Sequence, residues 1–155
     1  MHASKQSGFT LIELIVVIVI LGILASVALP RFVDLQGEAR RSVINSTSGS
    51  IQAANAMIYG KALVDGVASL PTSSIDIGGG VKVATAYGYP DATTAGIGAA
   101  LESAAGLSAL YSLNPDGTAT FLVNGARRPH QCQVAYTPPA RASGRPSVKT
   151  ATAGC

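Results

Sequence analysis

A nearly continuous apolar run of 21 residues, Phe9–Leu29, constrains this chain more than any other sequence feature. From Leu14 to Leu29 the only polar side chain is that of Ser26. About 20 apolar helical residues suffice to cross the hydrocarbon core of a bilayer. A secretory signal has a shorter apolar run and a small-residue cleavage site after it, and neither is present here. The run therefore predicts a membrane-spanning helix whose N-terminal end, with Lys5, stays in the cytoplasm.

Glu13 is the one acidic residue inside this run. An intramembrane carboxylate is costly, so it either reaches the headgroups or is held for a cation. If the chain is cut between Gly8 and Phe9, the new α-amino group of Phe9 lies four residues, about one helical turn, before Glu13. That amine can pair with Glu13 of the same chain or of a neighbour. Pairing with a neighbour would make the two charges an assembly contact.

The segment Gly8–Glu13 (GFTLIE), together with the apolar run after it, resembles the N-terminal signal of type IV prepilins and pseudopilins. The resemblance implies that a prepilin peptidase cleaves between Gly8 and Phe9 and that the Phe9 amine is methylated. It also implies that Glu13 guides docking onto a neighbouring subunit in a helical homopolymer. An inner-membrane assembly platform and minor pilins would be further partners.

Beyond Leu29 the pattern becomes that of an amphipathic helix packed on one side. Apolar residues recur mostly every three or four positions, at Phe32, Leu35, Ala39, Val43, Ile51, Ala54, Ile58 and Ala62. If the helix is continuous from Phe9 to Ala62 it is about 80 Å long, and only about 30 Å of it fits inside a bilayer. We therefore predict a leader at residues 1–8, a transmembrane and filament-core helix at 9–30, and a globular head at 31–155.

Gly22 and Pro30 are the weak points of this helix. Glycine costs about 1 kcal/mol relative to alanine in a helix, and proline lacks a backbone donor. Both are tolerated as kinks in membrane helices. The resemblance to pilins implies, in addition, that Gly22–Pro30 melts on assembly and makes the filament extensible.

The head is expected to be a small antiparallel sheet packed on the amphipathic half of the helix, which gives the α+β type IV pilin fold. Turn signals at Asn114–Gly117 and Asn124-Gly125 separate three expected strands, Leu107–Leu113, Thr118–Val123 and Gln131–Tyr136. Asp91 is the expected N-cap of a short helix through Ala104. Gly78–Gly80 predicts a turn, because no lysine with the spacing of a phosphate-binding loop follows it.

Cys132 and Cys155 are the only cysteines. Because the anchor implies export, the head would face an oxidising compartment, where disulfides persist. A bridge would close a loop of 24 residues, 132–155, and stabilise the head by about 3–3.5 kcal/mol. The alternative is two free thiols. A disulfide-bounded C-terminal region is also what the resemblance to type IV pilins implies.

The charges of the chain are unevenly distributed. Residues 117–155 contain five basic and no acidic residues, whereas residues 9–116 contain five basic and eight acidic ones. The basic residues could meet an acidic patch on the next subunit, or they could bind an anionic polymer such as DNA or surface polysaccharide. The candidate residues for such an anionic-ligand patch are Arg127, Arg128, Arg141, Arg145 and Lys149.

Catalytic and metal chemistry find little support in the sequence. His130 is the only histidine outside residues 1–8, and it has no partner at a ligand spacing. We therefore expect no enzyme activity, no cofactor and no metal.

A pseudopilin of a type II secretion system shares the N-terminal motif and stays an alternative, as does a minor or adhesive pilin. The major pseudopilin usually has a calcium site in its C-terminal loops, which the acid-free tail disfavours, and the cysteine pair favours a pilus.

Several short segments narrow the resemblance to one group of pilins, the mannose-sensitive haemagglutinin pilins of Gram-negative bacteria. The group's implied role is that of a major structural subunit in attachment and biofilm formation. Its subunits would lie in the inner membrane before assembly and in a surface filament afterwards. The segments are Pro30–Phe32, Asp34–Gln36, Glu38–Arg40, Ile51–Asn55, Tyr59–Ala62 and Gly88–Pro90.

Overall fold

The computed structural model describes residues 9–105 and 111–155, without the side chains of 30–34, 103–105 and 111. The chain divides into two compact units, Met1–Gly37 and Glu38–Cys155, which are described separately below. Helix α1, Leu11–Val64, contributes residues to both units. It has the 54 residues expected for Phe9–Ala62 but begins and ends two residues later.

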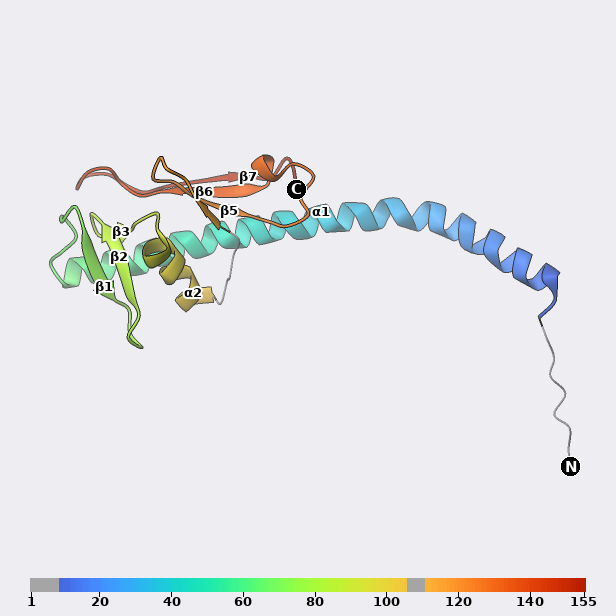
Figure 1. The fold of residues 1–155 in the computed structure, drawn as a ribbon, viewed down its shortest axis with the longest axis horizontal. Coiled ribbons are helices and arrows are strands. Elements are labelled where there is room, and N and C mark those ends of the chain that lie inside the picture. Colours follow the sequence, from blue (N-terminus) through green and yellow to red (C-terminus); the bar gives the residue numbers. More distant parts are fainter. Residues whose placement is uncertain (1–8, 106–110) are drawn as a thin grey trace, which may run out of the picture. The chain divides into compact units, whose positions relative to one another are not determined.

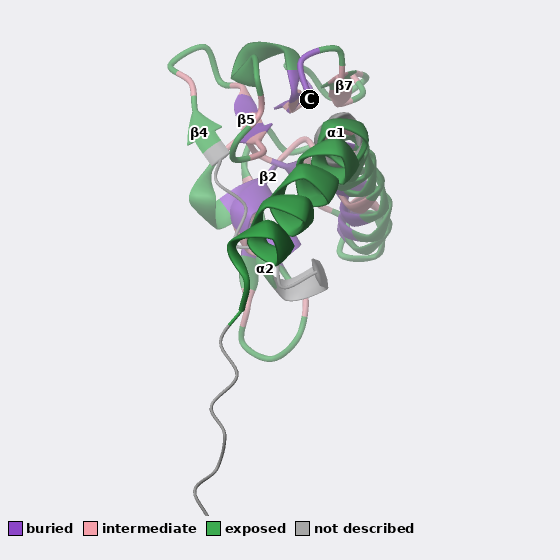
Figure 2. Ribbon diagram, turned by 90° about the vertical axis from the view of Figure 1, so that its right-hand side faces the viewer, coloured by how far each residue is buried: buried purple, intermediate pink, exposed green. Residues whose placement is uncertain are grey.

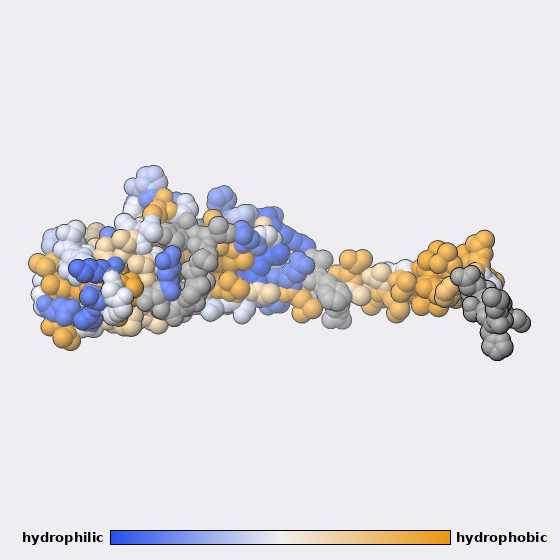
Figure 3. All heavy atoms as spheres, turned by 60° about the horizontal axis from the view of Figure 1, so that its bottom comes forward, coloured by the Kyte–Doolittle hydropathy of each residue, from blue (hydrophilic) through white to orange (hydrophobic). Residues whose placement is uncertain are grey.

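In the first unit, the residues of α1 from Leu11 to Leu29 are apolar except for Glu13 and Ser26. This stretch has a mean hydropathy of 3.0 and is long enough to cross a membrane. Most of its side chains are coloured as hydrophobic in Figure 3. Gly22 and Pro30 both lie within the helix. The melting of Gly22–Pro30 on assembly stays a prediction.

The second unit contains two antiparallel sheets beside the C-terminal part of α1 (Figure 1). The first has the strand order β1-β2-β3, formed by Ser73–Asp76, Lys82–Ala86 and Tyr89–Pro90. The second has the order β4-β5-β6-β7, formed by Tyr111–Leu113, Ala119–Leu122, Gln133–Thr137 and Ser147–Ala151. A π-helical turn η1 (Thr94–Gly98), helix α2 (Ala99–Ala105) and a short turn η2 (Pro129–Gln131) complete the unit. The expected α+β class is confirmed.

The core of this unit lies between α1 and the sheets, where the buried residues gather in Figure 2. Ile44, Ile51 and Ile58 of α1 are almost fully buried, as are Val83, Phe121 and Val134 of the sheets. The hydroxyl of Tyr136, on β6, donates a buried hydrogen bond of 2.6 Å to the carbonyl oxygen of Pro90, on β3. This bond joins the two sheets, and burial raises the pKa of Tyr136 well above its usual value.

The expected buried face of α1 was wrong at its N-terminal end. Leu35, Ala39 and Val43 are exposed, whereas Ile44 and Thr47 are buried. The buried face of α1 was hard to recognise in the sequence because it includes the polar residue Thr47. The Thr47 hydroxyl donates to the carbonyl oxygen of Val43 at 2.9 Å, so its hydrogen-bonding capacity is satisfied inside the core. The side chain of Phe32 lies outside the described part.

The second sheet contains the expected meander and one strand more. Strands β5 and β6 match the expected strands Thr118–Val123 and Gln131–Tyr136. Strand β4 matches the end of the expected strand Leu107–Leu113, whose residues 107–110 are outside the described part. The turn signal at Asn124-Gly125 lies between β5 and β6, which do pair, but the connection is longer than a tight hairpin: it spans residues 123–132 and includes η2. Strand β7 was not predicted, although it pairs with β6 over five residues.

The predicted turn at Gly78–Gly80 and the predicted helix cap at Asp91 had different outcomes. The glycines Gly78–Gly80 all have positive φ and connect β1 to β2, and the Asp76 carboxylate accepts from the Gly78 N–H at 2.8 Å, so the predicted turn is confirmed. The predicted cap at Asp91 was wrong. The hydroxyl of Thr93 accepts from the Gly96 N–H at 3.0 Å and caps η1, while Asp91 accepts a hydrogen bond from that same hydroxyl.

Candidate functional site

Glu13 is held by Thr10 at the start of α1. The Glu13 carboxylate accepts from the Thr10 backbone N–H at 2.8 Å and from the Thr10 hydroxyl at 2.6 Å. The Thr10 hydroxyl in turn accepts from the Glu13 N–H at 3.4 Å. This reciprocal pattern is a capping box, and its T-x-x-E signature was present in the sequence but was not used to assign a role to Thr10. In the single chain, a local donor pair therefore satisfies the carboxylate.

The predicted cleavage site borders this cap. Phe9 is 94% exposed and precedes the first turn of the helix, so its backbone has no packing against other described residues to resist processing. Gly8 lies outside the described residues. Cleavage between Gly8 and Phe9, methylation of Phe9 and pairing of its amine with Glu13 all stay predictions.

The apolar side chains that follow the cap have no covering partner within the described part of the chain. None of the residues Leu11–Leu29 is buried. Ile15 and Val16, for example, are about half exposed, and Leu11 is 76% exposed. Such a surface is stable only in lipid or against other apolar helices. The segment is therefore equipped both for a bilayer and for packing against copies of itself.

The disulfide between Cys132 and Cys155 is present, as the sequence predicted, and both residues are buried. Their Cα atoms are 4.9 Å apart. The bridge encloses β6 and β7, and the chain end is tied down further by hydrogen bonds between Arg128 N–H and Gly154 O (3.2 Å) and between Gly154 N–H and Gln131 O (2.9 Å). A Cβ on Gly154 would lie 2.5 Å from the Arg128 carbonyl oxygen, so this contact requires glycine.

The five basic residues of the C-terminal region do not gather in one cluster. Arg127 and Arg128 precede β6, next to the disulfide, whereas Arg141 and Arg145 belong to the loop at the other end of the β6–β7 hairpin. Lys149 lies on the edge strand β7, opposite Ala135. All five are exposed. The structure thus distributes them along one hairpin, and their role in anion binding stays a prediction.

Comparison with known proteins agrees with this arrangement. Residues 3–29 match a family model described as the prokaryotic N-terminal methylation motif. The type IV narrow pilus major component PilA5 of Thermus thermophilus is 47% identical over 53 residues, which cover 34% of this chain and 46% of that protein. Fimbrial protein Q of Moraxella bovis is 33% identical over 146 residues, which cover 81% of this chain and 91% of that protein. The chain belongs to the type IV pilin family.

A part of this pilin is also similar to a secretion protein. The type II secretion system core protein G of Pseudomonas aeruginosa is 44% identical over 54 residues, covering 35% of this chain and 38% of that protein. The pilin thus spans less than half of the length of that protein and of PilA5. No solved structure gives a significant match.

The described residues of the pilin include no group of three or more His, Cys, Asp or Glu side chains that could hold a metal ion. The expectations of no metal, no cofactor and no enzyme activity stay predictions.

Proposed function

We propose that this pilin is a major structural subunit of a type IV pilus and polymerises through its N-terminal helix into a surface filament for attachment and biofilm formation. The observation that carries the proposal is the apolar helix Leu11–Leu29, none of whose residues is buried, with Glu13 at its start. Lipid covers this helix while the subunit waits in the inner membrane. Neighbouring helices replace the lipid in the filament, with the heads outside.

The cap at Thr10 suggests how one subunit registers against the next. Before assembly, Thr10 supplies two hydrogen bonds to the Glu13 carboxylate. After a prepilin peptidase has cut before Phe9, the positive amine of a neighbouring Phe9 is a stronger partner than these neutral donors. Exchange of Thr10 for that amine, on the assembly platform and together with minor pilins, would fix the position of each incoming subunit.

Within the family, we infer a place among the mannose-sensitive haemagglutinin pilins of Gram-negative bacteria. The support is the set of short segments between Pro30 and Pro90 named above, which resemble that group. Major-subunit status and a role in attachment follow from this inference.

A pseudopilin of a type II secretion system is the second candidate, favoured by the similarity to core protein G. That similarity covers 54 residues, which are 35% of this chain. The similarity to fimbrial protein Q covers 146 residues and therefore includes much of the head. The longer match supports the pilus, and a minor or adhesive pilin stays the third candidate.

Immunogold electron microscopy tests this choice. Antibodies against the head are expected to label sheared filaments along their whole length, and deletion of the gene is expected to remove both the filaments and surface attachment. Label confined to the filament tip would indicate a minor or adhesive pilin. Filaments that persist after deletion, combined with loss of protein secretion, would indicate the pseudopilin.

A further inference from the structure

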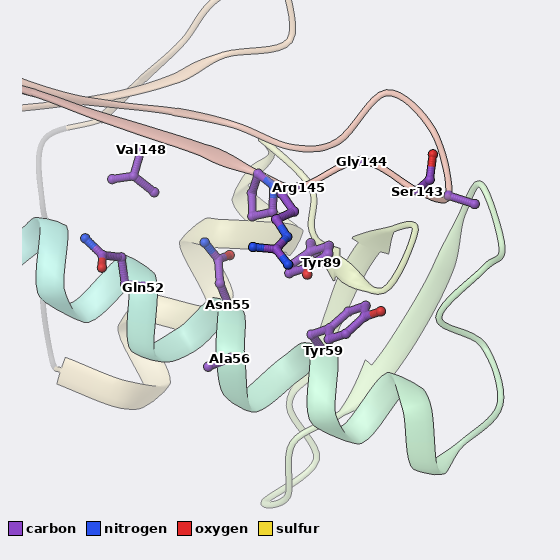
Figure 4. A pocket seen from close by; sticks show the side chains of 11 residues that line it. Gln52, Asn55, Ala56, Tyr59, Tyr89, Ser143, Gly144, Arg145 and Val148 are labelled. Atoms are coloured by element: carbon purple, nitrogen blue, oxygen red, sulfur yellow. The ribbon is translucent and has the colours of Figure 1, made fainter.

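The second unit contains a cavity of about 640 Å³ between α1, β3 and the loop that leads into β7 (Figure 4). Gln52, Asn55 and Tyr59 line it from α1, Tyr89 from β3, and Ser143 and Arg145 from the loop. Its volume lies within the range of small-molecule binding sites, about 300–1,000 Å³. The sequence singled out Arg145 as one of five candidate anion-binding residues, but no pattern placed it beside Asn55 and Tyr89, because the walls of the cavity come from three segments far apart in the chain.

Two tyrosines form an aromatic wall of the cavity. The rings of Tyr59 and Tyr89 are stacked, with centroids 4.4 Å apart and planes inclined by 10°. A stacked pair is rigid and presents a flat apolar surface edged by hydroxyl groups, which suits a ring with both apolar and polar faces. The Tyr89 pKa is raised by burial and by Tyr59, and the charge of Arg145 opposes this rise, so Arg145 acts electrostatically on the aromatic wall.

Asn55 supplies a buried acceptor that the protein itself does not satisfy. The residue is only 6% exposed, and its Oδ1 atom has no hydrogen-bond partner. Its amide extends from α1 towards the side of the cavity where Arg145 lies (Figure 4). An unpaired buried acceptor is destabilising, and because this atom has almost no exposed surface, a ligand O–H or N–H can donate to it only once the amide turns towards the cavity.

Arg145 provides the charge of the site. Among the described lining residues it is the one charged side chain. The ion pairs within the described part of the chain join Arg41 to Glu38 and Lys61 to Asp65, so no carboxylate there neutralises Arg145. A guanidinium next to an uncharged polar cavity favours a carboxylate, to which it can donate two parallel hydrogen bonds.

We propose that this cavity binds a uronic acid residue of an acidic polysaccharide. The sugar ring lies against the tyrosine wall, its carboxylate receives hydrogen bonds from Arg145, and one of its hydroxyls donates to Asn55 Oδ1. A simple inorganic anion would use neither the aromatic wall nor the acceptor, and a neutral sugar would leave Arg145 unpaired. The use of this site in attachment rests on the proposed pilus function, whereas ligand binding itself can be measured without a filament.

The test measures binding of methyl β-D-glucuronide to the full-length chain in detergent, with methyl β-D-glucoside as the uncharged comparison. Ligand-observed NMR is suited to the weak, millimolar to micromolar dissociation constants expected for one sugar unit. We expect the glucuronide to bind about tenfold more tightly than the glucoside, because only the glucuronide forms charge-assisted hydrogen bonds. Arg145→Gln should abolish this difference, and Asn55→Ala should weaken both ligands.

Arg141→Gln is the matched control, since Arg141 lies in the same loop, is exposed and does not line the cavity. It should change the affinity for the glucuronide less than about twofold, because an exposed charge that does not contact the ligand contributes little once solvent screens it. Thermal unfolding of each variant, compared with that of the unaltered chain, identifies any that fail to fold. If Asn55→Ala unfolds, Arg145→Gln together with its control still decides the proposal.

Three results would overturn the proposal. Equal losses of glucuronide affinity in Arg141→Gln and Arg145→Gln would mean that a diffuse basic surface binds the sugar. Tighter binding of a thymidine oligonucleotide than of the glucuronide would mean that the cavity is a nucleic-acid site. No saturable glucuronide binding to the solubilised chain or to filaments would mean no sugar site. Filament formation in Arg145→Gln is scored separately and is expected to be normal. Absence of glucuronide binding by the unaltered chain therefore counts against this site alone, and absence of filaments from the unaltered strain counts against the pilus.

Discussion

Glu13→Gln is expected to lower the yield of sheared filaments at least about tenfold, while the cleaved chain accumulates in the membrane. Glutamine retains an oxygen that can accept from the Thr10 N–H and hydroxyl, so the helix start survives. What is lost is the negative charge, and with it the ion pair that we propose between Glu13 and a neighbouring Phe9 amine. Quantitative immunoblots of the sheared and membrane fractions measure both effects.

Glu38→Gln is the matched control for this prediction. It makes the same chemical change on the same helix, at a side chain that is 68% exposed and paired with Arg41 at 2.8 Å. Exposed pairs of this kind contribute about 0–1 kcal/mol, so filament yield should stay within about twofold of the unaltered chain. A normal filament yield in Glu13→Gln would contradict the assembly role of the charge. An equal loss in both variants would show that the effect is not specific to the N-terminal site.

Removal of the disulfide is expected to give the largest loss of stability in the head. The bridge joins residues 23 positions apart, and its loss should cost about 3–3.5 kcal/mol through the entropy of the unfolded chain. For a unit of this size the melting temperature should fall by about 10–20 °C. The region involved includes β7, which pairs only with β6 and forms the edge of the sheet. Circular dichroism of the full chain in detergent measures the transition.

The design of this experiment separates the cross-link from the packing of the sulfur atoms. The double variant Cys132→Ala, Cys155→Ala removes both, and Cys132 is fully buried, so part of its loss would come from a cavity. The unaltered chain treated with a reductant keeps the sulfur atoms and loses only the bond. Its melting temperature should lie between those of the oxidised chain and the double variant. A melting temperature unchanged by reduction would contradict a stabilising role for the bridge.

The features that could be predicted from the sequence are those encoded within a few neighbouring residues. The apolar run, the position of Glu13 and the turns at Gly78–Gly80 and Asn114–Gly117 depend on local spacing and backbone preferences. The two cysteines could be paired because no others compete. The capping role of Thr10 was equally local and could have been found from its spacing to Glu13.

The features that could not be predicted depend on contacts between distant segments. Strand β7 follows a loop rich in proline and glycine and exists because β6 pairs with it. The short sheet of β1, β2 and β3 likewise has little pattern of its own, and the buried row of α1 includes Thr47, which a hydropathy pattern excludes. The cavity requires Asn55, Tyr89 and Arg145 to meet, and nothing in the sequence near any one of them indicates the other two.

The central claim, that this chain is a processed pilin that leaves the membrane in a filament, is tested most directly by the intact mass of the protein in the fraction sheared from cells. The account predicts an abundant species that lacks Met1–Gly8, carries one added methyl group and has lost the two hydrogens of an oxidised cysteine pair. A chain that retains its first eight residues in its native host, or that is processed but absent from the sheared fraction, would contradict the account.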